Sequence, residues 1–511
     1  MSANGYISEV DYLYGYYPET SPVRLRLALL ASGVGHSVGT VPNYLELGFG
    51  QGLSLSINAA TNDGNFYGTD FNPAQVANAL ELAQATGRPI SIFEDSFEQL
   101  AERTDLPQFD IIALHGIWSW VSDESRRAIV RIARDRLKPG GIFYISYNVT
   151  PGWSPAMPLR HLMAEYSKRA ATGGILERAQ KAINFVDQVM DCGAAYFATH
   201  PQLKARLDQI RKQDMHYIAH EYFNAEWEPM AFSKVADILS EAKLSFAGSA
   251  NILDNIPALS VHSSATEVLS EITDPILRET TLDYFVNRQF RRDIFVKGLR
   301  RLDGHQLRAT VSQQQFTLLA NATDCPSTVG TSVGDAELKQ DIYAPVIAAI
   351  DAADGKICSV EQLAQAEVCQ NIDFWQIWES LLVLTGAGTV APLDSMDVES
   401  SRTDAANSLN KFICAKSESL AGMQFLASPL IGSAVSVSWI DQIFIKALSD
   451  GVDDVPSRAW DILSAQGKRL IVEGNELPDK AANIAELQRL FKDFERVRLP
   501  ILRSLGIFLQ K

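Results

Sequence analysis

Over the first 150 residues, short apolar runs alternate with longer stretches that have the apolar spacing of amphipathic helices, and only a few turn residues separate them. This alternation is typical of parallel strands that are connected by helices packed on both faces of one sheet. We therefore expect an α/β fold with five strands in this part of the chain. They cover residues 43–47, 66–69, 90–93, 110–114 and 142–147.

The pattern farther along the chain predicts the rest of this sheet. A helix is expected over 232–242, and two apolar runs at 244–250 and 258–262 would complete seven strands. Segment 283–297 has helical spacing, and we expect its arginines to form a solvated or carboxylate-paired face. The first domain would then cover residues 1–270.

A long helical stretch separates the fifth predicted strand from the sixth. Residues 155–225 are therefore expected to form an insertion over the edge of the sheet, either as a lid that selects the substrate or as a contact in a homodimer. His216 and His220 lie four residues apart and would share a helix face, while Glu221 would lie on another side. We predict hydrogen-bonding roles for the histidines and no metal site.

The second half of the chain has a different organisation. Residues 271–335 are expected to be a helical connector that ends in the linker DCPSTVGTSVGD. Three helical segments and a strand then predict a winged-helix-like module over 336–397. Its third helix, 373–384, contains no Lys or Arg, which favours a protein contact over DNA. Residues 398–511 are expected to be mainly helical and to dock on the rest of the chain or on a second subunit.

Composition limits the partners. The net charge of −16 disfavours nucleic acid, because phosphate binding needs concentrated basic residues. The N-terminus lacks the pattern of a secretory signal, and no stretch has the eighteen or so apolar residues that span a bilayer. The five cysteines are scattered, which indicates reduced thiols in a cytoplasmic protein without structural zinc.

Acidic residues and glycines gather where the predicted strands end, which is the edge at which such sheets bind ligands. Glycines at a strand-to-helix turn allow close approach of the backbone, although many such turns only pack a helix. For Asp95 the alternative role is a helix N-cap. The candidate binding residues are Glu46, Gly48, Gly50, Gly52, Asp70, Asp95 and Ser96.

The order of these residues indicates a particular ligand. A carboxylate at the end of the second strand, Asp70, can accept both hydroxyls of a ribose. Glu46 would crowd a pyrophosphate but suits a cationic amine. S-adenosylmethionine has an amino-acid end, a ribose and an adenine. It fits Glu46 with the glycine turn, then Asp70, then Asp95 with Ser96, and its product would be S-adenosylhomocysteine.

Six motifs in this region resemble those of class I S-adenosylmethionine-dependent methyltransferases, which have a seven-stranded Rossmann-like sheet. They are ELGFGQG, GTD, EDSFE, HGIWSWV, LKPGG and YISYNVTPGW. The fourth and sixth, together with HEYFNAEWEPMAF and NRQFRRDIF, resemble the bacterial branch that carries a methyltransferase regulatory domain. That branch includes lysine methyltransferases acting on outer-membrane proteins.

The resemblance implies roles for residues after the fourth and fifth strands. His115 would lie beside the cofactor, where its adenosyl and methionine parts join. Trp118 and Trp120 would wall an acceptor pocket, because aromatic faces attract cationic amines; the alternative is that they pack the following helix. Tyr147 would orient the acceptor amine or hold its loop, and Asn148 is expected to be structural.

Together these features predict methyl transfer from S-adenosylmethionine, with a protein that exposes lysines as the partner. The lysine acceptor is implied by the resemblance, because one fold serves many acceptors. Two alternatives stay open. One is methylation of a small molecule or glycan, where His115 would act as a base, and the other is a regulatory protein that binds the cofactor without turnover.

Overall fold

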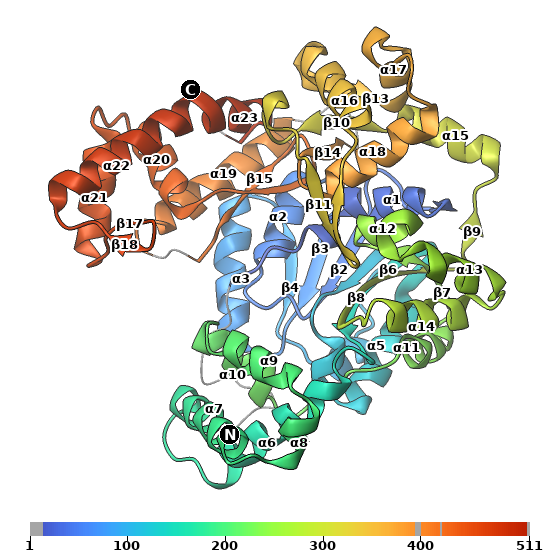
Figure 1. Cartoon of the computed structure of the whole chain (residues 1–511). Helices are drawn as coiled ribbons and strands as arrows, with labels where there is room; N and C mark the ends of the chain where they lie inside the picture. The colour runs from blue at the N-terminus through green and yellow to red at the C-terminus, as the bar shows by residue number, and fades with distance from the viewer. Residues whose placement is uncertain (1–13, 394–399, 420–421, 508–511) are drawn as a thin grey trace.

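A computed structural model describes residues 14–393, 400–419 and 422–507. Its centre is a seven-stranded sheet with the order β4-β3-β2-β5-β6-β8-β7, in which β8 runs antiparallel to both of its neighbours (Figure 1). The five strands predicted in the first 150 residues are confirmed. The strands of the sheet are β2 (Asn43–Leu47), β3 (Asn65–Thr69), β4 (Ile90–Phe93), β5 (Phe109–Leu114), β6 (Leu137–Asn148), β7 (Leu244–Ser249) and β8 (Phe290–Lys297).

Helices cover both faces of the sheet, because alternate residues of each central strand point to opposite sides. On β5, Ile111 lies in one buried cluster and Ile112 lies in another. The first cluster includes α1 (Pro22–Ala31), α2 (Leu53–Thr61) and α3 (Pro73–Thr86). The second includes α4 (Phe97–Glu102), α5 (Asp123–Arg136) and α11 (Phe232–Ser240).

The last strand of the sheet differs from the prediction. Residues 257–260 form a short helix, α12 (Pro257–Ser260), and the seventh strand is β8, inside the stretch that was expected to be helical. The charges of FRRDIFVK conceal the strand pattern in the sequence, because Arg291 and Asp293 are buried and paired with each other. The sheet therefore extends to Lys297, beyond the domain end predicted at residue 270.

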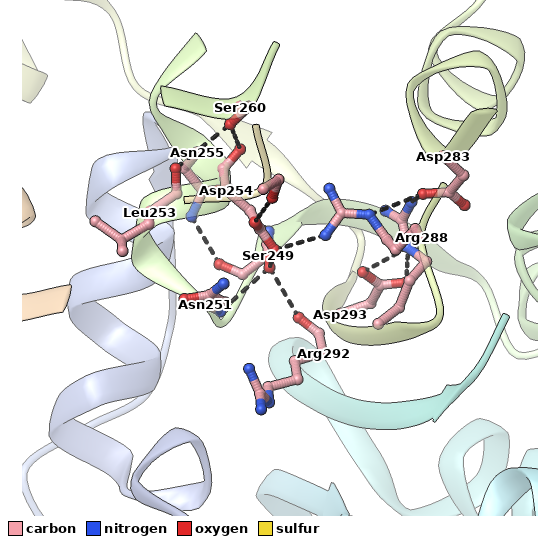
Figure 2. A network of polar contacts seen from close by, with 12 residues as sticks. Ser249, Asn251, Leu253, Asp254, Asn255, Ser260, Asp283, Arg288, Arg292 and Asp293 are labelled. Carbon is pink, nitrogen blue, oxygen red and sulfur yellow. Dashed lines mark hydrogen bonds and ion pairs between the residues drawn. The ribbon is translucent and has the colours of Figure 1, made fainter. Parts of the chain in front are cut away.

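Ion pairs connect β8 to the segments around it. After α14 (Pro275–Phe285), Arg288 reaches Asp254 at 2.8 Å and Asp283 at 3.0 Å, as Figure 2 shows. Arg291 on β8 also pairs with Asp283, at 2.7 Å. Burying charges is costly unless they are paired, and here each arginine meets at least two carboxylates. The network therefore fixes β8 to α14.

The predicted helical insertion is present and forms a separate lobe at the bottom of Figure 1. It has its own apolar core, which contains Met163, Val186 and Leu207. Its helices follow β6 and precede α11, so the lobe covers the ends of the strands where the site was predicted. They are α6 (Met157–Arg169), α7 (Ile175–Asp191), α8 (Ala195–Thr199), α9 (Gln202–Ile210) and α10 (Met215–Phe223).

The predicted linker contains regular structure. Most of it belongs to a hairpin of β11 (Thr328–Thr331) and β12 (Gly334–Glu337), in which Thr331 pairs with Gly334. The three predicted helices beyond it are α16 (Gln340–Ala352), α17 (Val360–Gln365) and α18 (Phe374–Gly386).

The sheet beside these three helices has three strands, and only the one after the third helix was predicted from the sequence. Strand β14 (Val390–Leu393) pairs with β10 (Gln315–Leu318), which precedes the hairpin and also pairs with β13 (Ile357–Ser359). A segment from before the predicted linker therefore completes the sheet. The comparison with a winged helix stays a prediction.

The C-terminal region is mainly helical, as expected, and docks on helices that cover the seven-stranded sheet. Helix α19 (Ser400–Lys416) packs against α2 and α3 (Figure 1). A hydrogen bond of 2.6 Å joins Tyr16 Oη to Ser433 Oγ across the contact. The other helices are α20 (Trp439–Ser449), α21 (Val455–Ala465), α22 (Lys480–Asp493) and α23 (Leu499–Ser504). Among the described residues no helix has the length and apolar character needed to cross a membrane.

Candidate active site

A cavity of about 1040 Å³ lies between the carboxyl ends of the strands and the helical insertion. Polar and aromatic residues line both sides. On the sheet side these include Glu46, Gly48, Gly50, Asp70, Asp95, Ser96, His115, Trp120 and Asn148. From the insertion and the loop before it come Trp153, Arg206, Tyr217, His220, Glu221 and Tyr222.

The three glycines of the turn after β2 have different functions. All have positive φ, which favours glycine. A Cβ on Gly52 would lie 2.5 Å from Ala79 Cβ, so this glycine allows α2 to pack against α3 and does not line the cavity. A Cβ on Gly50 would meet no atom within 4 Å. The backbone at Gly50 is therefore open to a ligand. Gly52 instead only allows two helices to pack, which was the alternative role considered for such glycines.

Two buried carboxylates flank this turn. Burial raises the pKa of Glu46 to about 8, although Tyr44 Oη donates a weak hydrogen bond to it at 3.5 Å. Asp70 accepts hydrogen bonds from the backbone N–H groups of Gly50 and Asn72, both at 3.0 Å, and burial raises its pKa to about 6. A cationic ligand in the cavity would favour the ionised form of both groups.

At the end of β4, the N-cap role and the ligand-binding role that were considered for Asp95 belong to different residues. Ser96 is the N-cap of α4: its Oγ accepts from Gln99 N at 3.3 Å, and its own N–H donates to Gln99 Oε1 at 2.8 Å. Asp95 forms an ion pair with Arg103 and lines the cavity. The N-cap role therefore belongs to Ser96, and the Asp95 carboxylate stays beside the cavity.

His115 lies at the end of β5 between two aromatic residues. Its Nδ1 forms a 2.7 Å hydrogen bond with Tyr144 Oη, and its ring stacks on Tyr17 with 3.7 Å between the centroids. Burial and the nearby Arg292 lower its pKa to about 3. The imidazole is therefore neutral near pH 7 and a weak base. Sequence reasoning did not find Tyr17, because it precedes the first strand and carries no motif.

The two tryptophans after β5 face different environments. Trp118 is fully buried in the core with β5, β6 and α5, so its predicted place in the acceptor pocket is wrong. Trp120 lines the cavity. The segment 118–120 is one 3-10 turn, in which residues two apart point in different directions. Trp118 packs in the core, which was the alternative role considered for both tryptophans, and Trp120 faces the cavity.

The end of β6 reverses the predicted roles of two neighbours. Tyr147 is buried, and its Oη donates to Asp293 Oδ2 at 2.6 Å, away from the cavity lining. Asn148 lines the cavity instead. Neighbouring residues of a strand point to opposite faces, so only one of the two can face the acceptor. The prediction that Tyr147 contacts the acceptor is therefore wrong.

Helix α10 contributes side chains that the sequence did not identify as functional. His220 and Glu221 both line the cavity. From α9, Arg206 stacks over Trp153 at 4.0 Å and donates to Gln289 Oε1 at 3.0 Å. The insertion therefore supplies one wall of the cavity, and its function as a lid stays a prediction.

Comparison with known proteins identifies the family. Residues 45–141 match the model of a methyltransferase domain, and residues 214–297 match the model described as "Predicted methyltransferase regulatory domain". Uncharacterized protein sll1526 from Synechocystis is 37% identical over 506 residues, which cover 98% of this chain and 99% of that protein. The chain belongs to the class I S-adenosylmethionine-dependent methyltransferases that carry this regulatory domain.

A solved structure shares the fold of this methyltransferase over almost its whole length. PKMT2 from Rickettsia typhi in complex with AdoHcy covers 97% of the chain and is itself covered completely, with a TM-score of 0.70 and 16% identity. Uncharacterized protein RP789 from Rickettsia prowazekii is 28% identical over 294 residues, 55% of this chain and 51% of that protein. The sheet and the mainly helical C-terminal region are therefore a shared architecture.

Proposed function

We propose that this methyltransferase methylates lysine side chains of a protein substrate. The observation that carries the proposal is the charge of the cavity lining. Among its described residues, carboxylates far outnumber the guanidinium of Arg206. Such a lining attracts a cationic acceptor and repels a phosphorylated one. The carboxylates are Glu46, Asp70, Asp95, Glu98, Glu124, Glu221 and Glu226.

The sheet side of the cavity fits S-adenosylmethionine. Glu46 and the open backbone at Gly50 would hold its amino-acid end, with Gly48 shaping the turn. Asp70 would accept the ribose hydroxyls, and Asp95 with Ser96 would lie beside the adenine. His115 and Tyr17 would wall the region between them. The cofactor supplies a methyl group on a positively charged sulfur, so an acceptor with a free electron pair is all that the reaction further requires.

Methylation of a hydroxyl with His115 as the base is less well supported by this site. Such an acceptor needs a base, and the sequence offered His115 for that purpose. Because the pKa of His115 is lowered to about 3, its imidazole has little tendency to take a proton from a hydroxyl. A lysine amine requires only loss of its ammonium proton.

The proposal is tested by incubating the protein and a cell extract with S-adenosylmethionine labelled in its methyl group. We expect label in the protein fraction. Label found only in small molecules or glycans would favour the alternative acceptor class, and cofactor binding without any transfer would favour a regulatory protein. The same extract incubated with the Asp70→Asn variant gives the background level of label.

Asp70→Asn is expected to weaken cofactor binding by about 1.5–3 kcal/mol, because a charge-assisted bond to the ribose is lost. Titration calorimetry measures the affinity, and the melting temperature shows whether the glycine turn has kept its fold. Asp237→Asn, an exposed carboxylate of α11, is the matched control. Equal affinities for the two variants, both folded, would contradict the assignment of Asp70 to the ribose.

Cofactor binding is expected to release about one proton at pH 7. Glu46 has a pKa of about 8 in the free protein and is mostly protonated at this pH, whereas a cationic amine favours its ionised form. Affinity should therefore rise between pH 6 and 7.5, by up to about tenfold per pH unit. Calorimetry in buffers with different ionisation enthalpies counts the protons. Glu46→Gln should abolish the release, and an unchanged count in this variant would exclude Glu46.

A further inference from the structure

Glu221 is a carboxylate of the insertion that lines the cavity but has no assigned function. It lies in the last turns of α10, beside Tyr217, Tyr222 and the loop residue Trp153, which line the same cavity. It is partly buried. A carboxylate that shares a cavity wall with aromatic residues is an unusual choice for packing alone, because charged groups are rarely buried without a partner.

Glu221 forms no ion pair with any residue that the structure describes. The two nearest arginines make other contacts. Arg160 of α6 stacks over Trp227 at 4.5 Å and donates to Asn224 O at 2.7 Å. Arg206 of α9 stacks over Trp153 and donates to Gln289. These guanidiniums act on Glu221 only from a distance, so the carboxylate is available to a cation that enters the cavity.

A second polar group faces the same place. Asn148 at the end of β6 is 3% exposed and lines the cavity, and its Nδ2 makes no hydrogen bond of normal geometry to a described residue. Its side chain instead makes a weak hydrogen-bond contact with the Glu221 carboxylate, which lowers the pKa of that group. Asn148 and Glu221 therefore form one polar site in the cavity wall, and their weak contact leaves both groups able to bind a ligand that enters.

We propose that Glu221 binds the ammonium group of the acceptor and takes its proton, with Asn148 and the aromatic rings around it orienting the amine. This inference rests on the proposed lysine acceptor and adds the residue that activates it. In water only about one lysine in 2,500 is neutral at pH 7. A carboxylate in contact with the ammonium group inside the cavity provides the neutral form where it is needed.

The proton balance of this step is simple. One ammonium proton moves from the amine nitrogen to a carboxylate oxygen of Glu221, which leaves a neutral amine with a lone pair and a neutral acid. The amine nitrogen then forms its bond to the methyl carbon as the carbon–sulfur bond breaks and its electron pair stays on sulfur. The product is a methylated ammonium ion, and the Glu221 proton leaves to solvent through the open cavity.

The protonation behaviour of Glu221 suits this task. Burial raises its pKa to about 7, so its carboxylate can accept a proton near neutral pH and return it. The groups that face it are Arg160 of α6, Arg206 of α9, Asn148 of β6, and Tyr217, His220 and Tyr222 of its own helix. His115, at the opposite wall, has too low a pKa to share the proton.

Glu221→Gln keeps the size and most hydrogen bonds of the side chain and removes only its basicity. At pH 7.5 we expect kcat to fall about 100-fold, with cofactor affinity unchanged. The remaining activity should rise about tenfold per pH unit up to pH 10, because the amine must then lose its proton to solvent. A purely structural role would instead lower activity equally at every pH. Glu267→Gln, an exposed residue of α13 (Ser263–Glu271), is the control.

A binding experiment separates this inference from the proposed function. In the presence of S-adenosylhomocysteine, n-butylammonium is expected to raise the melting temperature of the wild-type protein but not of Glu221→Gln, while neutral 1-butanol has no effect on either. Equal stabilisation of both proteins, or wild-type methyllysine formation that Glu221→Gln retains in full, would overturn the inference and leave the proposed function intact. Absence of methyllysine from the wild-type reaction would overturn the proposed function, and the butylammonium result would still decide whether Glu221 binds ammonium groups.

Discussion

Trp118→Ala is expected to lower the free energy of unfolding by about 3–5 kcal/mol, because it leaves a cavity in a core where this side chain is fully buried. Trp120→Ala should leave stability nearly unchanged, because Trp120 lines the active-site cavity. Its loss should reduce kcat/KM for a cationic acceptor by about 2- to 30-fold, the range of a cation–π contact. Chemical denaturation and initial rates measure the two effects.

The two tryptophans are therefore each other's control. They lie two residues apart in one 3-10 turn and differ mainly in what they face. Cofactor affinity should stay constant in Trp120→Ala, because the carboxylates proposed to hold the cofactor lie at the ends of β2, β3 and β4. Parallel loss of stability in both variants would show that Trp120 is a packing residue and not part of the acceptor wall.

Arg291→Met is expected to destabilise the fold by about 3–5 kcal/mol. Its guanidinium is 3% exposed and contacts Asp293 at 2.8 Å, Asp283 at 2.7 Å and Glu279 at 2.9 Å, and it stacks over Phe232 at 4.2 Å. Removing it leaves buried carboxylates without their main cation.

The melting temperature is the measurement for this variant. Arg300→Met, at an exposed position of β9 (Arg300–Arg301), is the matched control. If Arg291→Met melts at the same temperature as Arg300→Met, the buried network contributes little to holding β8 in the sheet. The pairing of β8 with β6 and β7 would then rest on its backbone and apolar residues alone.

Local signals predicted the first half of the sheet well. Helix α3 begins at Pro73 and ends at Thr86, because Asn72 caps its start and a glycine with positive φ, Gly87, follows its end. Such signals act within a few residues and can be read directly from the sequence. The same is true of Ser122, whose side chain caps α5.

Features that depend on distant partners could not be predicted in this way. Strand β8 was taken for a helix because its buried Arg291 and Asp293 have the charges of a surface segment, and only their pairing in the folded chain makes burial acceptable. The hairpin of β11 and β12 was taken for a linker because Gly, Ser and Thr are typical of both.

The residues of the candidate site divide in the same way, into those that local signals identify and those that depend on distant parts of the chain. Glu46, Gly50, Asp70 and Asp95 were found because they end consecutive strands, and the edge of a parallel sheet brings such positions together. Tyr17 and Glu221 come from segments outside that pattern, and the sequence does not show that they reach the cavity. The roles of Tyr147 and Asn148 were predicted the wrong way round. The pattern located the strand but did not show which face of the sheet each side chain would take.

Lysine methylation is tested most directly by amino-acid analysis of the labelled protein. The label is introduced by incubating this methyltransferase with a cell extract and methyl-labelled S-adenosylmethionine. After acid hydrolysis, we expect the label to elute with methylated lysines in the wild-type reaction and to be strongly reduced with Asp70→Asn. Label in any other amino acid, or in non-protein material only, would contradict lysine methylation as the function of this site.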